Sequence, residues 1–436
     1  IPKRDWSSDV CSSDLKHYIL NGEKIFITNG GWADIFIVFA QVDGNRFSAF
    51  IVEKDTEGFS VGAEEKKMGM KGSSTTSLIF QNAKVPAENI LYKVGKGATI
   101  AFNVLNIGRF KLGASSVGGS KNGIEAAAQY ALERRAFGQP ISKFDAIIKK
   151  IADMTVRTFS ADSMVYRTIG LLQNEIDSLD KSDPEYYFHV GEAMEKFAIE
   201  TSMTKVFGSE TSHFVVNEGL QILGGNGFLE EFPMAAAYRD DRINQIWEGT
   251  NEINRQIVAG YMMKKALMEE LPIRDAISNI ETFMSNGKLK DNEGPLSAEC
   301  ETIETGKRLA LFVFNEALNK FGQDLKHEQQ ITEMLADIFI DLYTAESTVV
   351  RAQKIMTDGN HDRTVCSIAK IFTAEMVLRL LNMSLTALNG IYGGYTSPQV
   401  FEQMRYFQAK MLMPTDIVNL KREVAQRIFN QKEYPF

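Results

Sequence analysis

The clearest candidate for catalysis in the sequence is Glu248, in the segment YRDDRINQIWEGTNEINRQIVA. It lies between Trp247 and Gly249, on an expected loop before a helix. Thr250 has the residue type of a helix N-cap, and Glu252 falls in the first turn that follows. A carboxylate beside a bulky apolar side chain is partly removed from water, which raises its proton affinity toward that of a useful general base. On residue types alone, an ordinary surface or capping carboxylate is the better interpretation.

A second segment that could take part in ligand binding is QILGGNGF, which contains Gln221, Gly224 and Gly225. Consecutive glycines leave the backbone bare, so a dinucleotide can approach it closely, although the same pattern also marks the end of a helix. It is not a Rossmann fingerprint, because no strand precedes it and the G-x-G-x-x-G spacing is absent. The run GGSKNG lacks the Walker spacing, and neither a G-x-S-x-G elbow nor a metal-type histidine cluster occurs. The sequence therefore predicts no phosphate loop, hydrolase elbow or metal site.

The composition is that of an ordinary globular protein. Of the 436 residues, 44% are hydrophobic and 24% are charged, with no compositional sign of disorder. A net charge of -8 argues against nucleic-acid binding, because a phosphate backbone requires a basic face. Cys11, Cys300 and Cys366 are far apart and form no CxxC pair, so neither a disulfide framework nor a zinc site is predicted. No transmembrane segment is predicted, because no apolar run is long enough to span a bilayer, and peripheral membrane contact stays open.

The elements that must position these residues begin with a β region. HYIL and EKIFIT flank an Asn-Gly pair at residues 21–22, which predicts a hairpin. DIFIVFAQV and RFSAFIVEK flank Asp-Gly-Asn at residues 43–45, which predicts a second one, and SLIFQNAKVP ends its strand at a proline. Residues 16–93 are therefore predicted to form one antiparallel, β-barrel-like unit.

Beyond residue 94 the apolar spacing changes to that of helices. Long helices are predicted near residues 98–135, 143–175, 185–224 and 250–270. They make residues 94–270 an α-helical bundle. A polar break, NGKLKDNEGPLS, precedes further helices, so residues 271–436 are predicted to be a second helical unit.

Residues 1–15 show no strand or helix period and are interpreted as a foreign or disordered segment. The predicted fold class is α+β.

Five motifs occur in a defined order along the chain: KIFITNG, GMKGSSTTSLIF, ERRAFGQPI, QILGGNGF and IWEGTNEI. In this arrangement they resemble the acyl-CoA dehydrogenase family, over nearly all of the chain from His17 to about Leu267. The tail beyond resembles, in length and helical character, the additional domain of the very-long-chain branch. The resemblance implies a middle β domain, an acyl-CoA dehydrogenase-type helical bundle and an extra C-terminal helical domain. The family's N-terminal helical domain is expected to be absent.

The resemblance implies flavin-dependent α,β-dehydrogenation of fatty acyl-CoA thioesters to trans-2-enoyl-CoA, as in fatty acid β-oxidation. Glu248 matches the glutamate of the family's EGT motif, which removes the α-proton while the β-hydrogen leaves as hydride to FAD. Some branches place the base immediately before an arginine of an earlier helix. Here Gly108 precedes Arg109, which leaves Glu248 alone in that role. The backbone N–H of Glu248 and the flavin ribityl chain are implied to polarise the thioester carbonyl.

FAD is the implied cofactor. Phe26, Ile27 and Thr28 match the strand residues that contact the flavin, a position in the β core being the alternative for Phe26. Arg134 matches the arginine that reaches the FAD pyrophosphate of a neighbouring subunit, and its alternative is a solvated helix-end charge. Asp145 replaces a glutamine often found after this motif, which puts that polar contact in doubt. The other residues implied to contact FAD are Gln221, Gly224, Gly225, Thr250 and Glu252.

Asn106, Arg109 and Gly249 are implied to contact the acyl-CoA substrate. An interhelical ion pair is the alternative for Arg109. The small residues 113–116 that follow allow either close helix packing or room for an acyl chain, and the sequence does not separate the two.

The implied partners are the acyl-CoA substrate, an electron-transferring flavoprotein as electron acceptor and a second copy of the chain in a homodimer. The implied location is the cytoplasm of a bacterium or the matrix side of a mitochondrion. Two alternatives remain: a dehydrogenase of branched, aromatic or glutaryl thioesters that uses the same glutamate, and a non-catalytic assembly factor of the same fold. The acyl chain length stays open.

Overall fold

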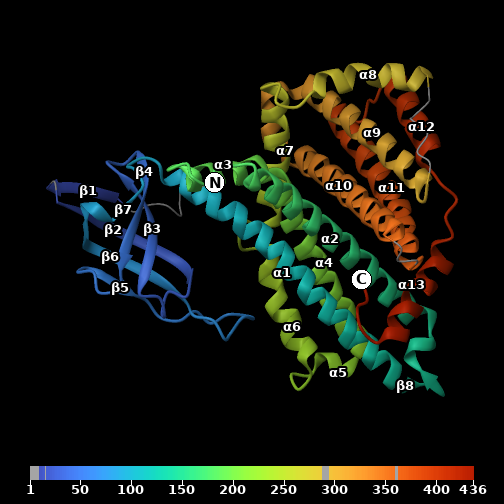
Figure 1. The fold of residues 1–436 in the computed structure, drawn as a ribbon, viewed down its shortest axis with the longest axis horizontal. Coiled ribbons are helices and arrows are strands. Elements are labelled where there is room, and N and C mark those ends of the chain that lie inside the picture. The colour runs from blue at the N-terminus through green and yellow to red at the C-terminus, as the bar shows by residue number, and fades with distance from the viewer. Residues whose placement is uncertain (1–8, 15, 287–293, 359–361) are drawn as a thin grey trace. The chain divides into compact units, whose positions relative to one another are not determined.

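The computed structural model describes residues 9–14, 16–286, 294–358 and 362–436 (Figure 1). The chain divides into two compact units, Ile1–Leu105 and Asn106–Phe436. The first is built mainly of strands and the second of helices, as the sequence predicts. The division falls inside helix α1 rather than at the expected boundary near residue 93, because the first turns of α1 pack with the sheet; the backbone of Ser48, for example, lies against Gly97.

A seven-stranded sheet forms the β unit, in the order β5-β6-β2-β1-β3-β4-β7. Its strands are β1 (Asp9–Asp14), β2 (His17–Thr28), β3 (Ile35–Val42), β4 (Arg46–Glu53), β5 (Phe59–Val61), β6 (Thr75–Pro86) and β7 (Ile90–Leu91). Strand β1 pairs with β2 and β3, so the prediction that residues 1–15 lack regular structure is wrong for Asp9–Asp14. Residues 1–8 and 15 lie outside the described part of the chain. Among the described strands no pairing joins β5 to β7, so the barrel-like closure is not confirmed.

The first predicted hairpin is wrong and the second is confirmed. Strand β2 runs straight through the Asn-Gly pair and pairs with β6 from His17 opposite Pro86 to Thr28 opposite Thr75. The register shifts between Leu20 and Gly22, so a β-bulge takes up the turn-prone residues. A long pairing with a distant strand outweighs the local turn preference. Strands β3 and β4 do form the hairpin predicted at residues 43–45.

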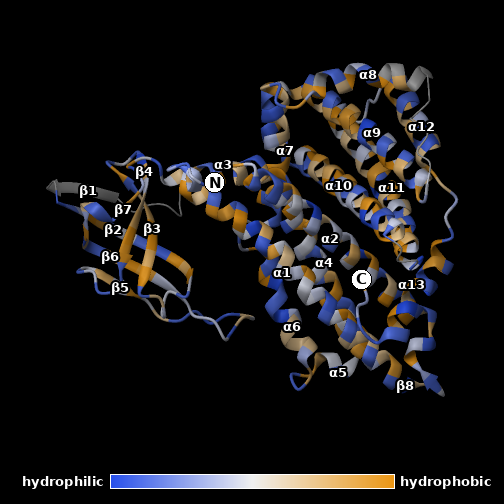
Figure 2. Ribbon diagram, in the orientation of Figure 1, coloured by the Kyte–Doolittle hydropathy of each residue, from blue (hydrophilic) through white to orange (hydrophobic). Residues whose placement is uncertain are grey.

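The β unit has its own core, which follows the period of two expected of strands. Strand β3 alternates exposed and buried residues, with Phe36, Val38, Ala40 and Val42 inward. They pack with apolar residues of β2, β4 and β6. Figure 2 shows the corresponding apolar stretches in orange on these strands.

The helical unit contains all the long helices. The helices are α1 (Gly97–Glu133), α2 (Asp145–Asp177), α3 (Tyr186–Lys196), α4 (Ala198–Leu223), α5 (Gly225–Phe228), α6 (Pro233–Asp241), α7 (Asn251–Leu267), α8 (Ile273–Asn286), α9 (Ser297–Phe321), α10 (Gln329–Thr357), α11 (Thr364–Ile391), α12 (Pro398–Met411) and α13 (Ile417–Gln431), with a short ribbon of β8 (Arg135–Ala136) and β9 (Gln139–Pro140). The predicted segment 185–224 is interrupted at Phe197, between α3 and α4. The predicted polar break falls largely on residues 287–293, outside the described residues. No helix in the described ranges is long and apolar enough to cross a membrane.

One continuous hydrophobic core joins the two predicted helical regions. It extends from Ile124 in α1 to Phe429 in α13. Helix α10 packs against α2 and α7 as well as against α11, and Figure 1 shows α10 and α11 side by side. The structure therefore has no boundary between compact units near residue 270.

The small residues that follow Arg109 serve helix packing at their first position. A Cβ at Gly113 would lie 2.6 Å from the carbonyl oxygen of Thr204, and one at Gly208 would lie 2.9 Å from Cα of Gly113. Helices α1 and α4 thus cross with backbone against backbone. Of the two interpretations that the sequence left open, close packing is the one that holds for Gly113.

Candidate active site

Glu248 lies in a strained turn directly before α7, hereafter the Glu248 turn (residues 247–250). Its φ is +56° and that of Gly249 is +81°. The left-handed conformation costs a residue with a side chain about 1–2 kcal/mol, whereas glycine adopts it freely. The Thr250 hydroxyl accepts a hydrogen bond from the N–H of Ile253, which confirms the predicted N-cap. The cap fixes the end of the turn, and other contacts must hold its strained middle.

Three buried donors hold the carbonyl groups of the Glu248 turn. Lys205 Nζ donates to the carbonyl oxygen of Gly249 at 2.8 Å. Asn254 Nδ2 donates to the same carbonyl at 2.8 Å, from the first turns of α7. Arg109 Nε donates to the carbonyl of Glu248 at 3.4 Å, from α1. A turn fixed from three helices keeps a conformation that its own residues disfavour.

The Glu248 carboxyl group is placed for proton transfer. It is half-buried, and this burial raises its pKa above the ordinary value of 4.5, while the charges of Arg109 and Lys205 lower it in part. A Cβ at Gly108 would lie 2.7 Å from Cδ of Glu248 and closer still to Oε2. The carboxylate therefore occupies space that any side chain at position 108 would take. Gly108 therefore does more than lack a side chain that could act as a base. It also leaves the space that the Glu248 carboxylate occupies.

Asn106 and Arg109 are brought to the same place, where they contact each other. They are 3% and 5% exposed, and Arg109 Nη1 donates to Asn106 Oδ1 at 2.9 Å. Arg109 also donates to the Glu248 turn, and among the described residues no ion pair joins it, so the alternative of an interhelical ion pair is not supported. Both side chains support the turn. Contact of either with substrate stays a prediction.

Phe26 is an exposed residue of the β unit. The pairing of β2 with β6 shifts between Lys24 and Ile27, and within this bulge Phe26 has a φ of +57°. Its ring is 67% exposed, so the alternative of a core position is wrong. Bulges turn side chains out of a regular strand. Phe26 and Thr28, which is also exposed, are thus available to a ligand.

The glycine turn and Arg134 form a second group of predicted cofactor residues. Helix α4 ends at Leu223, Gly224 has a φ of +60°, and a Cβ at Gly224 or Gly225 would meet nothing within 4 Å. Arg134 is exposed, and no described residue makes a hydrogen bond or ion pair with its guanidinium. Tyr130 links the two, since its hydroxyl accepts from Asn226 at 3.1 Å and its carbonyl from the Arg134 N–H. A free guanidinium beside open backbone fits a diphosphate.

The Glu248 turn and the glycine turn lie far apart within the helical unit. Lys205 reaches the Glu248 turn from the first part of α4, whereas Gly224 follows its last residue. At 1.5 Å per residue, they are separated by roughly 28 Å along the helix axis. Figure 1 places α5 and β8 at the same end of the unit. One chain therefore does not bring Arg134 and the glycine turn to Glu248.

Three charged residues in or near the motifs have local partners. Asp145 forms a two-bond pair with Arg422 of α13, at 2.6 and 3.1 Å, and these bonds lower the pKa of Asp145. Hydrogen bonds to its own backbone and to Thr250 lower the pKa of Glu252, which marks it as part of the helix start. Arg135, the neighbour of Arg134, donates to the carbonyl of Gly138 at 2.8 Å. FAD contacts by Thr250, Glu252 and Gln221 stay predictions.

Sequence reasoning missed the residues that hold the Glu248 turn, above all Lys205. It is the only lysine or arginine in α4, among apolar and small polar residues, and it is 0% exposed. A lysine within a mostly buried stretch of helix is a detectable signal, because such a charge needs a partner. Asn254 gave no comparable signal, since asparagine is common in a first helical turn.

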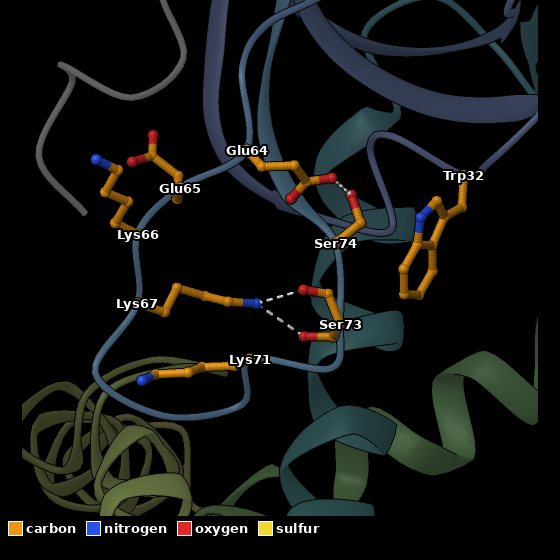
Figure 3. A pocket seen from close by; sticks show the side chains of 8 residues that line it. All are labelled: Trp32, Glu64, Glu65, Lys66, Lys67, Lys71, Ser73 and Ser74. Carbon is orange, nitrogen blue, oxygen red and sulfur yellow. Dashed lines mark hydrogen bonds between the residues drawn. The ribbon is translucent and has the colours of Figure 1, made fainter.

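A separate hollow lies in the β unit, between Trp32 and a loop that bears several lysines (Figure 3). Its volume is about 580 Å³. Lys67 donates to the hydroxyl of Thr75, and Glu64 accepts from the N–H of Thr75, so both charges fasten the loop to the first residue of β6. These charged side chains therefore hold the loop in place, and the hollow is a consequence of the loop conformation.

Comparison with known proteins agrees with the fold. The description "Acyl-CoA dehydrogenase, C-terminal domain" matches residues 95–263 and residues 305–405, and "Acyl-CoA dehydrogenase, middle domain" matches residues 4–83. A crystal structure of acyl-CoA dehydrogenase complexed with FAD from Bacillus anthracis is similar with a TM-score of 0.94 and 39% identity, over 98% of this chain and 73% of that one. The class is thus that of the FAD-containing oxidoreductases.

Two relatives define the family further. The chain is 41% identical over 421 residues to a probable acyl-CoA dehydrogenase of Bacillus subtilis (strain 168), which covers 96% of this chain and 70% of that protein. It is 33% identical over 392 residues to the mitochondrial very long-chain specific acyl-CoA dehydrogenase of Rattus norvegicus, and spans 57% of its length. The chain belongs to the acyl-CoA dehydrogenase family, and the predicted membership is confirmed.

Proposed function

We propose that the protein that contains this chain dehydrogenates fatty acyl-CoA thioesters between Cα and Cβ, with FAD as cofactor and Glu248 as the base. The observation that carries the proposal is the environment of the Glu248 carboxylate. It rests against bare backbone at Gly108, in a strained turn held by Arg109, Lys205 and Asn254. A purely structural glutamate does not need a turn of this cost.

The electrostatics of Glu248 suit removal of a weakly acidic proton. Burial raises its pKa, so its conjugate acid holds a proton more firmly than an exposed glutamate does. The charges of Arg109 and Lys205 oppose this shift in part, because they favour the ionised form of the carboxyl group. Glu248 is thus a stronger base than an exposed glutamate, with two cations beside it that favour its ionised form.

The thioester carbonyl must be polarised as the α-proton leaves, because charge develops on its oxygen. The backbone N–H of Glu248 has no hydrogen-bond acceptor among the described residues. It is therefore available as a donor to this oxygen, next to the base in the chain. The fixed carbonyls of the turn orient this N–H without reorganisation during the reaction.

The chain has residues suited to hold FAD. Phe26 and Thr28 present an aromatic face and a hydroxyl, while Arg134 and the open turn at Gly224 and Gly225 suit the pyrophosphate. When bound, FAD supplies the acceptor for the β-hydrogen, which leaves as hydride. The roughly 28 Å between Lys205 and Gly224 along α4 favours a homodimer in which each chain completes the FAD site of the other. Electrons then pass to an electron-transferring flavoprotein.

A long acyl chain is the favoured substrate. The support is the match of residues 305–405 to a second C-terminal domain together with the similarity to the rat very long-chain enzyme. A series of acyl-CoA substrates of increasing length on the full-length protein would rank them. Highest kcat/KM on a short or a branched thioester would contradict the proposal of a long-chain substrate.

Anaerobic reduction of the flavin tests the proposed reaction. Adding palmitoyl-CoA to the full-length yellow holoprotein should bleach the flavin absorbance. Glu248→Gln should keep the bound flavin but slow the bleaching by several orders of magnitude, of which about 10²–10⁴ is typical for loss of a general base. Near-normal reduction in this variant would show that another base acts. No bleaching with any acyl-CoA would refute the dehydrogenase function.

A further inference from the structure

Lys205 is a buried cation whose nearest partners are neutral. Its side chain is 0% exposed. Nζ donates to the carbonyl oxygen of Gly249 at 2.8 Å and to Asn251 Oδ1 at 2.7 Å. A buried ammonium group is costly unless its protons are used in hydrogen bonds. The Glu248 turn and the start of α7 therefore supply the acceptors that Lys205 needs, and Lys205 in turn fixes both.

A chain of partly buried polar contacts continues from Lys205 to the C-terminal helices. Asn251 Nδ2 donates to Glu210 Oε1 at 3.1 Å, and Arg255 Nη2 contacts the same oxygen at 2.8 Å. Arg255 Nε donates to Asp337 Oδ1 of α10 at 2.7 Å. Each link joins groups of opposite or complementary character, so the chain is a continuous network and not a set of isolated bonds.

We infer that Lys205 is a positioning residue for the Glu248 turn, and that the network behind it ties this turn to Asp337 in α10. The inference rests on the proposed function, in which Glu248 is the base. It gives the C-terminal helical region a role in the active site, although no hydrogen bond or ion pair joins a described residue of that region to the Glu248 turn.

The charges around Lys205 decide how its loss acts on the base. Glu210 and Glu252 face it and favour its charged form, as does Glu248, while Arg109 opposes it. Burial is the larger effect and lowers the pKa of Lys205 to about 8, so the cation predominates at pH 7. Because the Lys205 charge lowers the pKa of Glu248, a neutral residue at 205 must raise that pKa further. A further rise in the pKa of Glu248 is expected only if Lys205 lies beside the base. It therefore distinguishes a positioning role of Lys205 from a role in folding alone.

The experiment compares Lys205→Met with Lys150→Met in the full-length holoprotein. Lys150 is a partly buried lysine of α2 that is paired with Glu218, away from the Glu248 turn, and it serves as the matched control. Lys205→Met should lower kcat by about 10- to 100-fold, the scale of a misplaced catalytic group, with little change in KM. The acid limb of its pH profile should move to higher pH. Lys150→Met should keep both the wild-type kcat and the wild-type profile.

Lys205→Gln separates the hydrogen bonds from the charge and replaces Lys205→Met if the latter fails to fold. Glutamine can still donate to one of the two acceptors, so its kcat should lie between those of wild type and Lys205→Met. Its acid limb should move as far as that of Lys205→Met, because the charge is lost in both. A wild-type kcat together with a wild-type profile in either variant would overturn the inference.

Asp337→Asn tests the far end of the network. Loss of this charge loosens Arg255 and should lower kcat by about 2- to 30-fold, the range expected for coupling through a network. A wild-type kcat in this variant would overturn the link to α10.

An infrared titration of the Glu248 carboxyl group keeps this inference separate from the proposed function. The Glu248 band is identified by its absence in Glu248→Gln, and it is followed without substrate. A higher titration midpoint in Lys205→Met supports the placement even if wild type fails to reduce its flavin, which would refute the dehydrogenase function alone. An unchanged midpoint counts against Lys205 even if wild type is fully active.

Discussion

Replacing Gly108 by alanine is the most direct test of the geometry around the base. The new Cβ would lie 2.7 Å from the carboxyl carbon of Glu248, whereas two carbon atoms normally approach to about 3.5–4.0 Å. The carboxylate must therefore retreat by roughly 1 Å, and a displacement of this size costs about 100-fold in rate, or about 2.7 kcal/mol. Stability should not fall, because the flexible end of Glu248 can move and alanine is favoured over glycine within a helix by about 0.5–1 kcal/mol.

The assay measures flavin reduction by palmitoyl-CoA and thermal unfolding on the same preparations. Gly119→Ala is the control, since Gly119 lies on the same helix and a Cβ there would meet nothing within 4 Å. It should keep full activity and gain slightly in stability. Gly108→Ala should lose about 100-fold in kcat with an equal or higher melting temperature. Wild-type kcat in Gly108→Ala would refute the placement of the base, and an equal loss in Gly119→Ala would show a general effect of stiffening α1.

Three other outcomes are expected. Because burial raises the pKa of Glu248 in the folded protein, the native state binds this proton more tightly than the unfolded state, and its contribution to stability declines as pH rises above 4.5. Glu248→Gln should therefore gain in melting temperature relative to wild type as pH rises from about 4.5, and a difference that stays constant over this rise would contradict the shift. Gly113→Ala should destabilise the crossing of α1 and α4 by about 1–3 kcal/mol in denaturant unfolding, and an unchanged midpoint would refute the close contact. Arg134→Met should weaken FAD binding by about 10- to 100-fold in a fluorescence titration while Arg135→Met does not, and equal affinities would remove Arg134 from the FAD site.

The sequence predicted the local elements well wherever neighbouring residues decide the structure. The N-cap at Thr250, the end of α4 at Gly224 and the hairpin of β3 and β4 all depend on residues within a few positions of one another. The Asn-Gly pair at residues 21–22 failed as a hairpin because β2 gains more from pairing along β6 than from a local turn. A local sequence pattern does not predict long-range strand pairing of this kind.

The sequence by itself determined which residue is the candidate base, because Glu248 is embedded in a recognisable motif. Only the tertiary structure decided what holds it. Lys205 is 44 positions away along the chain and Arg109 is 139 positions away, yet both donate to carbonyl groups of the Glu248 turn. Gly108 likewise matters through the space that it leaves for a carboxylate on another segment. Burial, which sets the pKa of Glu248, arises from the packing of several helices, and no stretch of sequence contains that information.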